Sequence, residues 1–103
     1  MKYIIISAVF FLSFTPAYIG TPIKGDCTCN DINLWGNVKI VDNHADFTVQ
    51  IVDAHENIRV YNTPHTSKCG EWNFVDAHAD FTIQIVDAHA DFTIKYSDYP
   101  GLN

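Results

Sequence analysis

Apolar and polar residues alternate in a short unit that recurs along most of the chain. Successive units open at Asp46, Asn57, Cys69, Asp80 and Asp91, in steps of 11, 12, 11 and 11 residues. Within a unit, the first, third and fifth residues after the opening residue are mostly apolar, and the second and fourth are mostly polar. Alternation with a period of two is typical of a strand with one buried face. Each unit therefore predicts one strand followed by one turn.

This register places Ile51 and Ile83 on the buried face and Gln50 and Thr82 in solvent. Trp72 occupies a third position and is predicted to lie in the core. An earlier half-unit, ending in Val-Lys-Ile, fits the same register. The expected strands cover residues 37–42, 46–53, 57–62, 70–76, 80–87 and 91–97.

The turns between units read Asp-Asn-His-Ala, Asp-Ala-His-Glu or Asp-Ala-His-Ala, without glycine. Two-residue hairpins favour turns that contain glycine, whereas near-identical units suit a stack in which like residues lie above like. We therefore expect an all-β fold of about six short strands. A β-solenoid with two strands per coil is favoured, and an antiparallel meander or small barrel is the alternative.

The first 20 residues are predicted to be a secretory signal peptide. Lys2 provides a short basic region, an apolar run follows to Phe14, and Thr15-Pro16-Ala17 offers a small residue for cleavage. The run is too short to span a bilayer, which needs about 20 apolar residues. We expect a secreted or periplasmic protein with a signal peptide at 1–20, a cap or linker at 21–35 that holds two cysteines, and a β-repeat domain at 36–103.

The cysteines indicate a disulfide. An oxidising compartment favours pairing, and Cys27 and Cys29 are too close to pair easily with each other, so Cys69 is expected to pair with Cys27 or Cys29. A loop of about 40 residues closed in this way contributes about 4 kcal/mol in the chain-entropy model. Such a staple suits a small core.

The charge balance limits the partners. Asp and Glu number 12 against 6 Lys and Arg, which gives a net charge of -6. Such a surface repels nucleic acid and anionic lipid. We expect a protein partner, or self-association through an exposed sheet edge, and no membrane span in the mature form.

The Asp-x-His-x-Asp turns are the candidate chemistry. In a stacked solenoid they would bring imidazoles and carboxylates together, a donor set that suits zinc, copper or nickel. The competing interpretation is structural, with Asp accepting backbone N–H bonds and His packed over the turn. That interpretation is favoured and requires no cofactor. The candidate metal ligands are His44, His55, His78, His89, Asp42, Asp46, Asp76, Asp80, Asp87 and Asp91.

Nothing in the sequence supports catalysis. The chain has no phosphate-binding glycine loop and no Gly-x-Ser-x-Gly, and its aspartates recur with the repeat. Cys69 lies near His65 and Ser67 in sequence, but a catalytic triad is defined by its arrangement in space. A disulfide explains Cys69 better.

Three stretches resemble a family of short exported bacterial β-repeat proteins. They are LWGNVKIVD at 34–42, SKCGEWNFVD at 67–76 and DYPGLN at 98–103. Members of that family have no settled activity and commonly carry Val-Asp-Ser-Phe-Pro-Asp turns where this chain has Val-Asp-Ala-His-Ala-Asp. The resemblance implies that an aromatic residue can replace the repeat histidines. The expected function is binding or self-association outside the cytoplasm, not catalysis, and the alternative is a divalent-metal-binding envelope protein.

Overall fold

The computed structural model describes residues 23–103, so the expected signal peptide lies outside the described residues. All six predicted strands are present, somewhat shorter than expected. They are β4 (Gly36–Ile40), β5 (Phe47–Ile51), β6 (Ile58–Asn62), β7 (Glu71–Phe74), β8 (Phe81–Ile85) and β9 (Phe92–Tyr96). Three two-residue strands, which the alternation did not predict, are β2 (Thr28–Cys29), β3 (Ile32–Asn33) and β10 (Gly101–Leu102).

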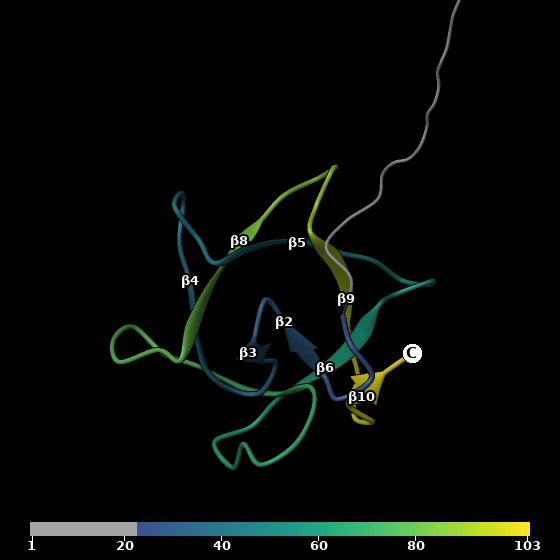
Figure 1. Ribbon diagram of the computed structural model, residues 1–103, viewed down its shortest axis with the longest axis horizontal. Coiled ribbons are helices and arrows are strands. Elements are labelled where there is room, and N and C mark those ends of the chain that lie inside the picture. Colours follow the sequence, from purple (N-terminus) through teal and green to yellow (C-terminus); the bar gives the residue numbers. More distant parts are fainter. Residues whose placement is uncertain (1–22) are drawn as a thin grey trace, which may run out of the picture.

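The six long strands run parallel and close into a barrel in the order β4-β8-β5-β9-β6-β7, with β7 returning to β4 (Figure 1). The chain passes round this barrel twice. The first pass lays down β4, β5 and β6, and the second places β7 beside β6 and inserts β8 and β9 between strands of the first. Neighbouring strands therefore come from different passes.

The antiparallel meander is wrong, because every pairing between barrel strands is parallel. The alternative of a small barrel is correct in its closure, and the solenoid is not confirmed. Parallel neighbours that follow each other in the chain usually need connections of a dozen or more residues. The short repeat turns avoid this requirement because each one joins strands that are two places apart in the barrel.

A steep strand tilt makes such short connections sufficient. Phe81 pairs with Val38 on one side of β8, whereas Ile83, two residues later, pairs with Phe47 on the other side. The same two-residue shift recurs at β5 and β9. Each shift tilts the strands relative to the barrel axis. The end of a strand is therefore displaced along the barrel circumference from its start.

First and third positions of the repeat fill the barrel. Trp72, predicted to lie in the core, is fully buried, and its indole Nε1 donates a 2.9 Å hydrogen bond to the Leu34 carbonyl. The Phe47 ring lies 5.9 Å from that of Phe81 and 5.4 Å from that of Phe92. Aromatic pairs at such distances contribute about 0.5–1.5 kcal/mol beyond the area that they bury. Alternation thus identifies these core positions correctly.

The burial predicted for the fifth positions of the repeat is wrong. Ile40 is 51% exposed, Ile51 46%, Ile85 38% and Tyr96 46%. Each is the last residue of its strand, so its side chain lies at the end of the barrel, beyond the last filled layer. Ile51 therefore does not share the burial of Ile83, which is fully buried.

The other end of the barrel, where the strands begin, is covered by the segment before β4. The hairpin β2–β3 lies inside the outline of the ring of strands (Figure 1), and the Leu34 carbonyl accepts a 3.1 Å hydrogen bond from the N–H of Gly70, directly before β7. Leu34 and Cys29 join the core. Cys27 forms the predicted disulfide with Cys69, directly before β7, with Cα atoms 5.8 Å apart. Cys29 is the free cysteine of residues 23–103. Within residues 23–103, the barrel thus has one covered end and one open end.

Candidate binding surface

The repeat histidines lie in the turns that connect the strands. His44, His55, His78 and His89 have φ values of 56°, 61°, 60° and 58°, in the left-handed region where His is more frequent than most residues. All four are exposed, and the connections that carry them project away from the barrel (Figure 1). Within residues 23–103, no three His, Cys, Asp or Glu side chains are grouped as a metal site requires. Metal binding by the repeat turns stays a prediction.

The opening residues of the repeat tie each strand to its neighbour. The Asp46 carboxylate accepts from the Thr82 backbone N–H at 2.9 Å, while the Thr82 hydroxyl accepts from the Asp46 N–H at 2.9 Å. Asp91 and Thr48 form the same reciprocal pair, with distances of 2.9 and 3.0 Å. This arrangement supports the structural interpretation for Asp46 and Asp91.

Two variations show what this cross-strand pair requires. Asn57 pairs with Thr93 through its amide oxygen, at 2.8 Å from the Thr93 N–H, so an acceptor suffices without charge. Asp80 accepts from the Asn37 N–H at 2.7 Å and packs against Gly36, where a Cβ would clash with the carboxylate. Glycine at position 36 therefore makes room for this pair at the start of β4.

The remaining predicted acids follow the strands in the chain, toward the end of the barrel where the strands finish. Asp42, Asp76 and Asp87 each follow a fifth position by two residues and are exposed. Asp53 and Asp98, which sequence reasoning did not single out, occupy the same position in their units. In the turn at 76–80, Asp76 borders a hollow with Phe74, whereas Asp80 borders one with Ile32 of the hairpin, so these two acids lie toward opposite ends of the barrel.

The fifth positions together form an apolar ring at the open end. Because each of the six strands contributes one residue, the side chains encircle the barrel axis. Phe74 contacts Tyr96 across a ring-centroid distance of 6.5 Å, and partial burial raises the pKa of the Tyr96 phenol. One hollow at this end is lined by Ile40, Phe74, Val75 and Asp76. The apolar ring consists of Ile40, Ile51, Phe74, Ile85 and Tyr96, with Asn62 at the sixth place.

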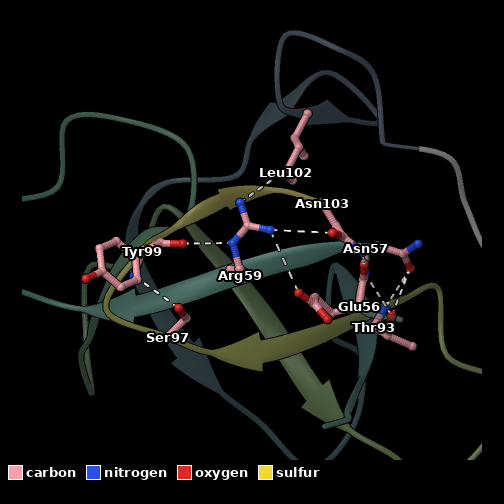
Figure 2. Close-up of polar contacts among 8 residues, drawn as sticks. All are labelled: Glu56, Asn57, Arg59, Thr93, Ser97, Tyr99, Leu102 and Asn103. Atoms are coloured by element: carbon pink, nitrogen blue, oxygen red, sulfur yellow. Dashed lines mark hydrogen bonds and ion pairs between the residues drawn. The ribbon is translucent and has the colours of Figure 1, made fainter. Parts of the chain in front are cut away.

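The chain end is fixed to the barrel by a polar network that the alternation did not reveal (Figure 2). Arg59 donates to the Tyr99 carbonyl at 2.8 Å and to the Leu102 carbonyl at 3.1 Å. The Asn103 amide donates to the Glu56 carbonyl at 2.9 Å. A signal was present in the sequence, because Arg59 stands at a second position that three other units fill with threonine.

A signal for the apolar ring was also present. The unit that opens at Asn57 has Asn62 at its fifth position, and a buried strand face would not readily accept an amide without a partner. Every fifth position is followed by at most one further residue before its turn. These two facts together distinguish the end of the barrel from its interior.

These features define a disulfide-stapled parallel β-barrel, closed by two interleaved passes of the chain and exposing apolar side chains at one end. The chain belongs to the 7(1) septoil knot domain family, whose model matches residues 31–103. The family's description names a knot, and knots are rare among protein folds. The matched range nearly coincides with the resemblance noted above, although the match does not test the motifs on which that resemblance rested. No curated protein matches the chain.

Residues 23–103 form strands, turns and irregular segments, and no helix among them is long and apolar enough to cross a membrane.

Proposed function

We propose that this protein is exported and acts by binding a protein partner at the open end of its barrel, without catalysing a reaction. The single observation that carries this proposal is the apolar ring. A small soluble domain gains stability by covering such side chains, and contiguous exposed apolar surface marks interaction sites. Here the two ends of one barrel differ, since the hairpin β2–β3 covers the first and leaves the second exposed.

The open end is a better binding surface than a sheet edge. We expected an exposed edge to recruit a second strand, but barrel closure pairs both sides of each long strand. The gap beside the first half of β6 is filled by β10, where Leu102 pairs with Ile58. Closure of this kind removes the edges through which strands add, so contacts at the open end depend on side chains.

The disulfide supports export. Disulfides persist in oxidising compartments and are rare in the cytosol, and Cys27 and Cys69 are directly bonded. The release of residues 1–20 can be read from the intact mass of the protein recovered from its native cell. A mass that retains Met1 would contradict export by cleavage.

Paired variants test the binding role. Ile40→Ser with Ile85→Ser removes two members of the apolar ring, and Gln50→Ser with Gln84→Ser is the control on the outer face. Each tagged, oxidised variant is mixed with extract of its native cell envelope, and bound proteins are identified by mass spectrometry. We expect a partner held by the wild type and by the outer-face control but lost from the ring variant. Identical bound sets for all three proteins would refute the proposal.

A further inference from the structure

Five exposed aspartates stand where the chain leaves the strands at the open end. Each follows a fifth position by two residues, and they are Asp42, Asp53, Asp76, Asp87 and Asp98. Asp76 lines the hollow that contains Ile40 and Phe74. Asp98 lines a second hollow beside Tyr61 and Tyr96. Negative charge and apolar surface therefore meet at the same end of the barrel.

These five carboxylates differ from those that open the repeats. The Asp46, Asp80 and Asp91 carboxylates accept hydrogen bonds from backbone N–H groups of neighbouring strands. The five at the open end have no hydrogen-bond or ion-pair partner within residues 23–103. The two lysines at fourth positions, Lys39 and Lys95, leave acids in excess there. The fold therefore uses one set of acids internally and leaves the other set available.

From this arrangement we infer that the partner at the open end is a protein segment that combines apolar side chains with Lys or Arg. This inference rests on the binding role proposed above and specifies the chemistry of the partner. Apolar side chains would enter the ring, and the cations would lie against the surrounding carboxylates. Complementary charge at the rim of an interface increases the association rate and selects among partners.

Charge also decides against a second copy of the chain as the occupant. Contact between two open ends would place two sets of five carboxylates against each other, and like charges opposed in an interface are unfavourable. Anionic lipid and nucleic acid meet the same repulsion. A cationic apolar segment is the occupant that satisfies both the ring and its acids.

Selection from a random library of 12-residue peptides tests this inference. The oxidised protein, 21–103, is held through an N-terminal tag so that the open end faces the library. Peptides that survive washing should be rich in Lys or Arg and in aromatic or aliphatic residues. Synthetic copies should bind less tightly as salt rises, because screening weakens exposed ion pairs.

Matched variants separate charge from apolar contact. Asp76→Asn with Asp98→Asn removes two charges at the open end and should weaken binding about two- to thirtyfold, the combined effect of losing two exposed ion pairs. Asp31→Asn with Asp46→Asn removes two charges at the covered end and should leave binding unchanged. Asn suits both control sites, because Asp31 has a positive φ of 64° and Asn57 already replaces Asp in one cross-strand pair.

Each outcome bears on a different step. The selected peptides could lack excess positive charge, and could fail to bind Ile40→Ser/Ile85→Ser while still binding the Asp76/Asp98 variant. That result would overturn the cationic partner and leave the binding role intact. If the selected peptides bind the Ile40/Ile85 variant as tightly as the wild type, or if no peptide is enriched, both the cationic partner and the binding role at the open end are contradicted. Concentration-dependent dimers in sedimentation, abolished by Ile40→Ser/Ile85→Ser, would identify a second copy instead.

Discussion

Two substitutions of Asp46 test its pair with Thr82, because one keeps the hydrogen-bond acceptor and the other removes it. Asp46→Asn keeps an oxygen where the Thr82 N–H and hydroxyl now find one, at 2.9 and 3.3 Å. Asp46→Ala removes that acceptor. Asn57 shows that an amide oxygen can perform the same task for Thr93. The two substitutions should therefore differ, although both remove the same charge.

The expected magnitudes follow from these contacts. A hydrogen bond to a charged group contributes about 1.5–3 kcal/mol, and a neutral one about 0.5–1.5 kcal/mol. Asp46 is exposed, so water can replace part of what is lost. We expect Asp46→Ala to lower the free energy of unfolding by about 1–2 kcal/mol and Asp46→Asn by about 0.5 kcal/mol or less. For a domain of this size, 1 kcal/mol lowers the melting temperature by about 4–8 °C.

The measurement is equilibrium denaturation of the oxidised protein, approached from both the folded and the unfolded side to show that equilibrium has been reached. Adding Thr82→Val to Asp46→Ala gives a double-mutant cycle, whose coupling term should be about 0.5 kcal/mol or more. Equal losses for Asp46→Asn and Asp46→Ala would mean that charge matters and the acceptor does not. No loss in either variant would refute a stabilising role for the pair.

Four further predictions concern the core, the staple, the turns and the long connection. Ile83→Asp should cost at least about 3 kcal/mol, because it removes a fully buried side chain, whereas Ile51→Asp at the open end should cost about 1 kcal/mol or less in the same denaturation assay; equal losses would contradict the assigned ring. Replacing Cys27 and Cys69 by Ser should lower stability by about 4 kcal/mol for a sequence separation of 42, and the oxidised wild type should weigh two mass units less than its reduced form. Changing all four repeat histidines to Asn, which accepts their left-handed backbone, should preserve the fold; a rise in melting temperature on adding zinc or copper, seen only with the histidines present, would instead favour metal binding. Hydrogen bonds from the backbone N–H groups of Ser67 and Lys68 hold the pKa of Glu71 below its ordinary value. The stabilisation that Glu71 gives to the 63–70 connection is therefore present at neutral pH and lost as pH falls below the ordinary Glu pKa of about 4.3; hydrogen exchange of that connection should lose this pH dependence in Glu71→Gln.

The strands could be predicted from the sequence because alternation is a local property. Every first and third position with an apolar residue in the long strands proved buried, as Phe47, Val49 and Trp72 illustrate. The left-handed histidines could not be predicted, since the resemblance suggested an aromatic residue at those places. In the last segment the residue four places after the fifth position is Pro100, and the proline ring cannot adopt a positive φ. The turn at the chain end therefore has a different backbone from the repeat turns.

The order of strands could not be predicted, because near-identical units are interchangeable as partners. Residues 75–85 and 86–96 share most of their sequence, yet β8 lies between β4 and β5 whereas β9 lies between β5 and β6. Residues that depart from the common residue type at their repeat position distinguish the places. Gly70 is one of them, since its φ of 83° and its contacts with Arg59 and Gly101 leave no room for a side chain.

The interleaved path also limits how many repeats the molecule can hold. A seventh unit, placed two positions beyond β9 like the units before it, would arrive at the place already occupied by β7. The chain instead turns back there, and β10 runs antiparallel to β6 for only two residues. A solenoid can gain a unit at its end and become longer, but this barrel has no vacant position to receive one. Tandem duplication, which the nearly identical units record, therefore reaches a fixed maximum that is set by the geometry of closure.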